Sequence, residues 1–344
     1  MSGNPPATDG LDQAALWEFS KTPLPEGVPS FDPNDVVESA VIRRLVGNWH
    51  RRATVKRDEP DLDELFEPER ADYPEKILPF HDHPTYLALD PAKRSELLSW
   101  AWIAYNRHTV MAEQKVANPA FALVMEGEYP GLSGEALNLS LAQAMVDEQY
   151  HTLMHLNASA VTRRRRGHAM PDDALPLSYT ARVHQELRDK AAERWQQSLT
   201  TLAFATVSEI SINAYLDLLA DDTEIQPINS TTATLHNRDE YCHASISHVL
   251  AQTVYDKLDA TQRRFFLDML MEGLDAFVTN DYSTWRRIVD LSGIAGGREM
   301  LMDCQAESGR KRLVRDYTGL RKLVDELGVA DQVDFDWSRS HVTG

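Results

Sequence analysis

Cysteine is nearly absent from this 344-residue sequence, which holds only Cys242 and Cys304, neither of them in a C-x-x-C pair. Two such cysteines cannot build a disulfide framework, so we expect the reducing cytoplasm as the compartment. The sequence also lacks an apolar run approaching the ~20 residues that span a bilayer. Its first thirty residues lack the cationic start and apolar stretch of a secretion signal. We therefore expect a soluble protein with no membrane partner.

Positive charge is in short supply: 35 Lys and Arg stand against 53 Asp and Glu, which gives a formal net charge of −18. A surface this acidic repels phosphate backbones, so we expect no nucleic-acid partner. The basic run Arg163–Arg166 most simply forms a solvated helix C-terminus, where cations complement the carbonyl end of the helix dipole. A docking patch for a redox or carrier partner is the alternative.

Strand signals are weak throughout, and the sequence contains no G-x-G-x-x-G, phosphate loop or G-x-S-x-G motif. Long stretches with helical period are present instead, which predicts an all-α protein. Residues 1–35, rich in Pro, Asp and Gly, are expected to form a flexible N-terminal tail before a single domain over residues 36–340. Helices are expected at 36–51, 92–117, 133–165, 178–220, 230–257 and 260–279, with shorter ones at 283–290, 297–307 and 310–327.

Four of the long helices place a glutamate on the stripe where apolar residues are expected. In the helix over 133–165, Glu148 follows Leu141 and Ala144 along the inner face. Because a helix presents one stripe to its neighbours, each of these carboxylates is expected to point into the interior. The corresponding residues on the other three helices are Glu113, Glu209 and Glu240.

Four unpaired carboxylates in one interior are untenable, since each loses several kcal/mol of hydration and all repel one another. No Lys or Arg lies on the same stripes at that depth. Two divalent metal ions would balance the charge and leave neighbouring histidines neutral. A mixture of carboxylates and imidazoles suits iron or manganese, and we expect two iron ions because a reduced pair with open positions can bind O2 as co-substrate. No catalytic side chain is expected beyond this centre.

The spacing of the histidines sharpens this prediction. Glu148-x-x-His151 and Glu240-x-x-His243 alternate with the two lone glutamates, which is the ligand pattern of ferritin-like dinuclear carboxylate proteins. One Glu-x-x-His motif often arises by chance, whereas two in this alternation are specific. We therefore expect a ferritin-like four-helix bundle core with additional flanking helices.

Neighbouring residues extend the expected site. His236 lies four residues before Glu240 on the same face and is expected to be a third imidazole ligand, with a core histidine as the alternative. Metal-bound histidine usually donates its second N–H to a carboxylate. Asp147 and Asp239 are therefore expected to hold the ligand histidines, the alternative being surface positions. His155, one turn beyond the Glu and His set, is expected to be a core histidine.

Together these residues resemble the di-iron arylamine N-oxygenases, a family that includes the p-aminobenzoate N-oxygenase of aureothin biosynthesis and the arylamine oxygenase of chloramphenicol biosynthesis. The resemblance extends over about residues 36–337, through segments such as WIAYNRHTVMAEQ (102–114) and DEQYHTLMH (147–155). His236 is the ligand that distinguishes this family among ferritin-like proteins. The matching ligand set is Glu113, Glu148, His151, Glu209, His236, Glu240 and His243.

The resemblance implies a homodimeric enzyme of antibiotic biosynthesis that binds two irons and converts a small aromatic amine, through hydroxylamine and nitroso stages, to a nitroarene. Nitrogen as the oxidised atom comes from the resemblance alone. Because the sequence has no flavin or nicotinamide fingerprint, an external reductase or ferredoxin-like carrier is expected to supply electrons. A di-iron hydroxylase or desaturase acting on carbon, an iron-storage protein and a radical-generating subunit are the alternatives.

One departure from the family bears on the substrate. Where the p-aminobenzoate enzyme has an arginine five residues before its first ligand glutamate, this chain has His108, and Arg107 is turned from that position by ~100° of helix. A free benzoate loses its anchor, so the resemblance is closer to the chloramphenicol-type enzyme with its larger aminophenyl substrate. Use of p-aminobenzoate is the alternative. Tyr105, His108 and Asn213 are candidates for the pocket wall, with ordinary packing as the alternative.

Overall fold

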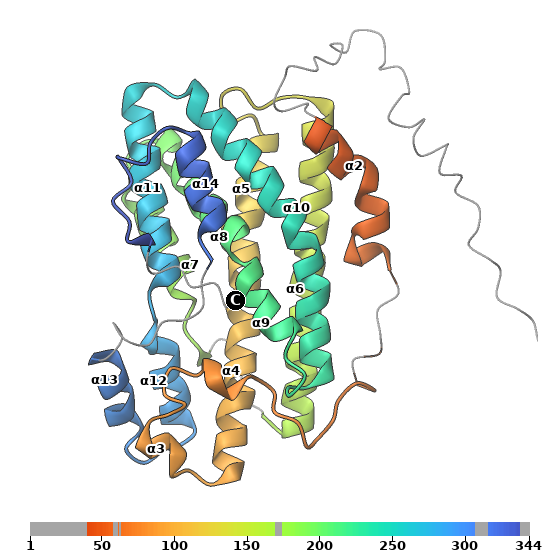
Figure 1. Ribbon diagram of the computed structural model, residues 1–344, viewed down its shortest axis with the longest axis vertical. Helices are drawn as coiled ribbons and strands as arrows, with labels where there is room; N and C mark the ends of the chain where they lie inside the picture. The colour runs from red at the N-terminus through yellow and green to blue at the C-terminus, as the bar shows by residue number, and fades with distance from the viewer. Residues whose placement is uncertain (1–39, 58–60, 62, 169–173, 307–315, 338–344) are drawn as a thin grey trace, which may run out of the picture.

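Four long helices lie side by side at the centre of the structure, a computed structural model that describes residues 40–57, 61, 63–168, 174–306 and 316–337 (Figure 1). They are α4 (Pro91–Ala112), α6 (Glu135–Arg166), α8 (Arg194–Ser211) and α10 (Pro227–Lys257). Within the described ranges, β pairing amounts to an isolated bridge between residues 71 and 225. The all-α, ferritin-like four-helix core is confirmed. The expected tail, residues 1–35, lies outside the described residues.

Shorter helices surround this bundle and confirm the flanking elements. α11 (Ala260–Val278) packs closely on α8 across Gly273, where a Cβ would lie 3.2 Å from Val207. α2 (Ala40–Arg52) packs on the outer side of α6. The remaining elements are η1 (Thr54–Lys56), η2 (Glu75–Ile77), α3 (Pro84–Leu87), α5 (Asn118–Met125), α7 (Tyr179–Lys190), α9 (Asn213–Ala220), α12 (Tyr282–Leu291), α13 (Gly297–Ala306) and α14 (Thr318–Glu326).

The prediction of one helix over 178–220 is wrong, because the chain forms three. Ala191 and Glu193 have extended backbones, and the Glu193 side chain starts α8 by a reciprocal capping box with Gln196. A second break follows at Ile212, between α8 and α9. Capping chemistry at residue 193 thus overrides the helical period that runs through it.

The first long helix also differs from its prediction, since it does not end at residue 117. α4 continues through a π-helical turn, η3 (Glu113–Ala117), directly into α5. Pro119 has no backbone N–H with which to bond the carbonyl of Lys115, and this favours the wider turn. Such turns are frequent at functional sites.

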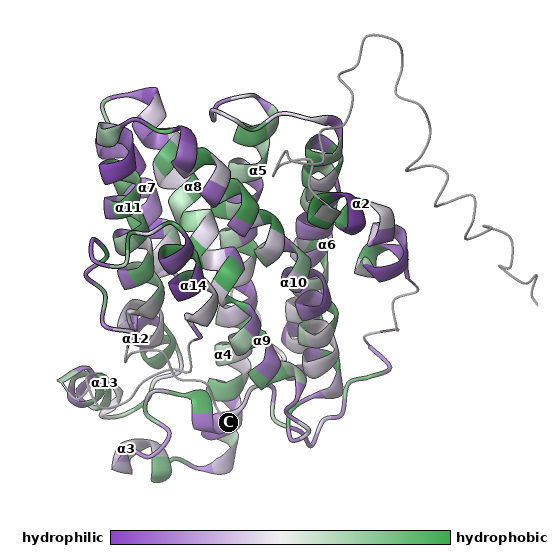
Figure 2. Ribbon diagram, turned by 45° about the horizontal axis from the view of Figure 1, so that its top comes forward, coloured by the Kyte–Doolittle hydropathy of each residue, from purple (hydrophilic) through white to green (hydrophobic). Residues whose placement is uncertain are grey.

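Apolar side chains fill the bundle on either side of one polar level. One cluster gathers around Leu141, Leu202 and Leu250, and another around Trp102 and Leu216. Among the described helices, the stretch 194–220 is long and apolar enough by composition to cross a membrane, but 61% of its apolar window is buried inside the fold. Its apolarity, visible along α8 in Figure 2, is that of a core helix.

The basic run ends α6 as predicted and also binds the Pro-rich segment that precedes α4. The Arg166 Nε lies 2.9 Å from the Asp72 carboxylate, and the Arg164 guanidinium contacts Asp63. The run therefore ties residues 63–72 to the end of the bundle.

Candidate metal centre and substrate cavity

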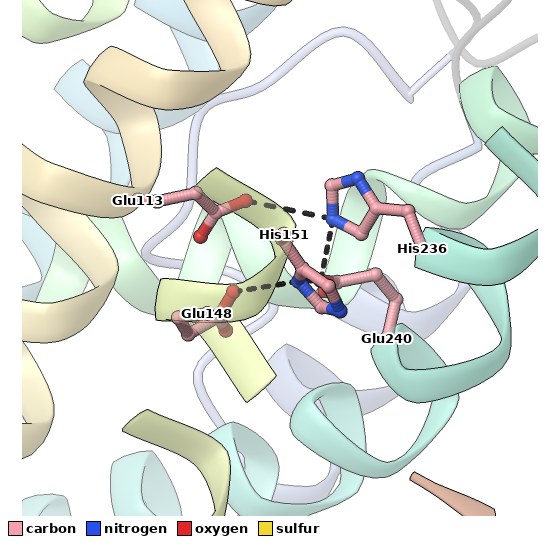
Figure 3. Close-up of side chains that lie close together, drawn as sticks. All are labelled: Glu113, Glu148, His151, His236 and Glu240. Atoms are coloured by element: carbon pink, nitrogen blue, oxygen red, sulfur yellow. Dashed lines mark hydrogen bonds and ion pairs between the residues drawn. The ribbon is translucent and has the colours of Figure 1, made fainter. Parts of the chain in front are cut away.

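Four glutamates from the bundle helices meet in the interior. Glu113 begins η3 at the end of α4, and Glu148, Glu209 and Glu240 lie on α6, α8 and α10. Their exposed fractions are 6%, 0%, 4% and 2%. Figure 3 shows three of them, Glu113, Glu148 and Glu240, gathered with two histidines. The expected convergence of the four carboxylates is confirmed.

The predicted ligands form two overlapping groups, in each of which one donor atom per residue lies within 4.8 Å of the others. Glu148 and Glu240 belong to both groups. Glu113, His151 and His236 complete the first group, and Glu209 and His243 complete the second. Two adjoining positions with two shared carboxylates form the arrangement that a pair of metal ions requires.

Unsatisfied polar atoms at this cluster also fit a metal pair. Glu148 Oε1, Glu209 Oε2 and His243 Nδ1 are buried and have no hydrogen-bond partner. His243 Nδ1 lies 2.8 Å from Glu148 Oε1, but without hydrogen-bond geometry. A buried polar atom left without a partner costs ~1–3 kcal/mol. Coordination to metal ions would satisfy all three atoms.

The pKa shifts of the clustered side chains also fit a site for a metal pair. Burial, followed by the charge of Glu148, raises the pKa of Glu113 and of Glu209 well above the ordinary value. Burial acts to lower the pKa of His151 and of His243, but the surrounding carboxylates outweigh it and both pKa values are raised. In the metal-free protein, shared protons therefore hold the cluster together, and metal ions would displace them.

Two buried aspartates hold the ligand histidines in a crossed arrangement. Asp239 Oδ2 lies 3.3 Å from His151 Nε2, and Asp147 Oδ2 lies 3.4 Å from His243 Nε2. Each aspartate thus contacts the histidine of the other motif, because α6 and α10 face each other. Arg52 Nη1 lies 3.6 Å from an oxygen of each aspartate. The alternative expectation, that these aspartates lie at the protein surface, is wrong, since both are fully buried.

The third histidine, His236, has its own support. Its Nε2 lies 2.8 Å from Glu240 Oε1, and its Nδ1 lies 2.8 Å from His155 Nε2. His155 Nδ1 in turn lies 2.7 Å from the side-chain oxygen of Asn106. His155 is therefore not only a core histidine, because it also connects His236 to Asn106 by hydrogen bonds.

The direction of this chain of hydrogen bonds follows from Asn106. Its amide nitrogen donates to the Trp102 carbonyl at 2.7 Å, so its oxygen faces His155 and accepts from Nδ1–H. The lone pair of His155 is then on Nε2 and accepts from His236 Nδ1–H. This leaves the lone pair of His236 Nε2 facing the carboxylates, as a metal ligand requires.

A cavity of about 260 Å³ lies beside the cluster and follows α4. Its wall extends from Glu113 back to residue 101, ~18 Å of helix rise. Tyr105 and His108 line the cavity. The candidate Asn213 does not: the break at Ile212 redirects the start of α9, and the Asn213 amide donates to Asn237 at 2.8 Å.

Away from the glutamates, the mostly apolar cavity wall carries a few polar groups. His108 Nε2 lies 3.2 Å from Thr284 Oγ1, and burial lowers the pKa of His108 to about 4, so its imidazole is neutral at neutral pH. Asp281 also lines this part, and its carboxylate lies 2.7 Å from Arg182. Among the residues that the structure describes, no Lys or Arg lines the cavity, and Arg107 lies outside its wall.

The family described as p-aminobenzoate N-oxygenase AurF matches residues 35–328 of this sequence. The chain belongs to this family. A relative, the 4-aminobenzoate N-oxygenase of Streptomyces thioluteus, is 39% identical over 303 residues, which cover 88% of this chain and 90% of that protein. Membership confirms the resemblance and makes the chain an oxygen-dependent N-oxygenase with a dinuclear metal centre, which the buried cluster fits.

Solved structures of an R2-like ligand-binding oxidase reconstituted with a Mn/Fe cofactor show a weak structural similarity to this chain. One mutant is 13% identical, with 90% of this chain and 94% of that chain covered and a TM-score of 0.43. Another is 14% identical, with 91% of this chain and 100% of that chain covered and a TM-score of 0.42.

Sequence reasoning missed the residues that support the N-oxygenase ligands from outside. Trp49 Nε1 donates to both oxygens of Asp147 at 2.9 Å, and the backbone N–H of Thr54 donates to Asp239 at 3.2 Å. Nothing in their spacing relates α2 and η1 to the distant motifs. Asn106 was missed for the same reason, whereas His155 carried a signal because it continues the stripe of its helix.

Proposed function

We propose that this N-oxygenase converts an uncharged aminophenyl compound, of the kind oxidised in chloramphenicol biosynthesis, to the corresponding nitroarene through hydroxylamine and nitroso stages. The absence of Lys and Arg from the described cavity wall carries this proposal. Burying a carboxylate without a cationic partner costs several kcal/mol. Asp281 and the neutral His108 would add nothing to offset that cost. The alternative is p-aminobenzoate, the substrate in the name of the Streptomyces thioluteus relative.

The seven predicted ligands would hold two irons, with Glu148 and Glu240 shared between them. When bound, a reduced iron pair supplies the electrons and open coordination positions that activate O2. The protein excludes water from the cavity and keeps the amine beside the cluster.

An aromatic wall aligns the substrate ring. Tyr105 and Tyr215 both line the cavity, with ring centroids 5.6 Å apart, and the buried Trp102, outside the lining, lies 5.4 Å from Tyr105. At the polar end, Thr284 and His108 can hydrogen-bond a hydroxyl group of the substrate. The cavity therefore suits an amine at one end and an uncharged polar group at the other.

Competing substrates test this proposal. The iron-loaded enzyme, chemically reduced, is given O2 with p-aminobenzoate or with an aminophenyl-propanediol, and the product masses are determined over time. We expect the amine of the diol to be oxidised to the nitro group with the higher kcat/KM. Equal or better use of p-aminobenzoate would contradict the substrate assignment. Hydroxylation on carbon would instead favour the alternative of a carbon-acting oxygenase.

We also propose a cytoplasmic homodimer in which residues 36–340 form one domain. Large apolar residues line the outer face of α6 at intervals of seven and three residues, and each is 42–48% exposed. A contiguous apolar stripe of this kind favours a protein interface. The residues are Leu139, Val146, Leu153 and Leu156.

A further inference from the structure

One surface of this acidic protein is strongly basic. Residues 40–57, which form α2 and η1, contain six Arg and Lys and no Asp or Glu, although acidic residues outnumber basic ones 53 to 35 in the whole chain. Four of the cations, Arg44, Arg51, Lys56 and Arg57, are exposed. We call these four residues the basic face. Arg44 and Arg51 lie on α2, Lys56 ends η1 and Arg57 follows it. Figure 2 shows α2 at the edge of the bundle, beside α6.

The basic face surrounds a tryptophan. Lys56 Nζ lies 4.7 Å from the centre of the half-buried Trp49 ring, and the Arg57 guanidinium donates to the Arg51 carbonyl at 2.5 Å. Asp63, six residues after Arg57 in the sequence, is paired with Arg164 at the end of α6. Positive charge is therefore concentrated where this indole approaches solvent.

A chain of short contacts connects that tryptophan to the metal ligands. Trp49 Nε1 lies 2.9 Å from the Asp147 carboxylate, which lies 3.4 Å from His243 Nε2. On the other side of the ring, His243 Nδ1 lies 2.8 Å from Glu148. Electron tunnelling falls steeply with distance and is faster along bonded and hydrogen-bonded contacts than across gaps. This chain therefore offers a short way into a cluster whose ligands are otherwise buried.

We propose that the basic face is the docking surface for an acidic, ferredoxin-type iron–sulfur protein, and that Trp49, Asp147 and His243 form the electron path from it to the metal pair. This rests on the proposed function, in which O2 chemistry needs a reduced centre. In each encounter one electron would pass from the iron–sulfur cluster to the metal pair. The iron–sulfur cluster is thereby oxidised by one electron, and the metal pair is reduced by one electron. A second reduced carrier delivers the second electron.

Charge complementarity explains why this surface takes an acidic partner. At a net charge of −18, most of the molecule repels an anionic protein, so a local basic region decides the orientation of an encounter. Complementary charge of this kind raises association rates and suppresses wrong orientations. The docked carrier would then sit directly over Trp49.

Binding of an acidic plant-type [2Fe–2S] ferredoxin to the iron-loaded enzyme, measured by calorimetry at low and physiological salt, tests the surface. The triple variant Arg51→Glu, Lys56→Glu and Arg57→Glu should bind at least about tenfold more weakly, since each exposed ion pair contributes up to ~1 kcal/mol. The matched control reverses three exposed cations on α7, α11 and α14, namely Lys190→Glu, Arg264→Glu and Lys322→Glu. Equal weakening by the control, or no ferredoxin binding to the wild type, would overturn the docking surface.

The electron path is tested by Trp49→Phe, which keeps an aromatic ring but removes the N–H that contacts Asp147. Stopped-flow absorbance should show slower reduction of the metal centre by reduced ferredoxin at unchanged ferredoxin affinity. The rates are compared per bound iron, because loss of the contact to Asp147 also removes support from a predicted ligand. Reduction by dithionite with a small mediator should keep its rate. An unchanged rate with ferredoxin would refute the path.

Failure of this proposal can be told apart from failure of the proposed function. If chemically reduced enzyme oxidises an arylamine to the nitroarene but ferredoxin does not bind at the basic face, the docking surface alone is refuted. Ferredoxin-dependent reduction through the basic face, without any nitrogen oxidation, would refute the proposed function and leave the docking surface standing.

Discussion

Replacing Asn106 by Leu should weaken iron binding by roughly 10- to 100-fold, the range for loss of a group that supports a metal ligand. The leucine is similar in size to asparagine but lacks the oxygen that lies 2.7 Å from His155 Nδ1. Asn106 is buried, touches no substrate cavity and is not itself a predicted ligand. The expected effect therefore acts entirely through His155 and His236.

The magnitude follows from two ways in which His155 could respond. It could keep its Nδ1 proton without a partner, which costs ~1–3 kcal/mol for a buried donor. It could instead move the proton to Nε2, which lies 2.8 Å from His236 Nδ1, and so force His236 to carry its own proton on Nε2, the ligand atom. Because ~1.4 kcal/mol corresponds to tenfold in affinity, either response gives one to two orders of magnitude.

Anaerobic titration with Fe²⁺ against a competing chelator measures this affinity, and circular dichroism checks the helical fold. Asn106→Asp keeps an oxygen that can accept from His155 and should bind iron nearly as well as the wild type. Asn213→Leu, which removes a half-buried asparagine amide outside the cavity, controls for loss of an asparagine side chain as such. Wild-type affinity in Asn106→Leu, or equal loss in the Leu and Asp variants, would refute the reasoning.

Four other outcomes are expected. The folded-state pKa values of His151 and His243 lie well above the ordinary value of 6.5. The stability that their protons contribute is therefore fully present below pH 6.5 and is lost as pH rises from there through the folded-state values. The melting temperature of the metal-free protein should therefore fall as pH rises past 6.5, and the melting temperature of the iron-loaded protein should fall less. If the melting temperature of the metal-free protein does not fall, the shared-proton account is contradicted. Glu209→Gln should lose about one iron per chain in metal analysis, because Glu209 belongs to one of the two ligand groups; full occupancy would oppose that grouping. Leu153→Asp should shift the mass measured by light scattering from dimer toward monomer, and an unchanged mass would place the interface elsewhere. Thr284→Arg should raise kcat/KM for p-aminobenzoate relative to the diol, whereas the uncharged Thr284→Gln should not; equal effects would show that charge is not the deciding factor.

The bundle and its converging glutamates could be predicted because helical period is a local property. The step from Ala144 to Glu148 fixes which face Glu148 shares, whatever the rest of the chain does. Helix breaks were harder to predict, since residues 191–193 continue the period and the break depends on the Glu193 capping box.

The support around the metal centre could not be predicted, because it depends on packing between distant segments. The crossed contacts from Asp147 to His243 and from Asp239 to His151 require the facing of α6 and α10. Trp49 reaches Asp147 only because α2 packs on α6, 98 residues away along the sequence. No spacing rule connects such positions.

Iron analysis of the purified enzyme, loaded anaerobically and freed of excess metal, tests most directly whether the buried glutamates hold a metal pair. We expect about two irons per wild-type chain, as in ferritin-like carboxylate centres, with absorption that changes when O2 is added and again with an arylamine. A folded protein that retains no iron, or retains it equally after Glu148 and Glu240 are both replaced by Ala, would contradict the shared-carboxylate site.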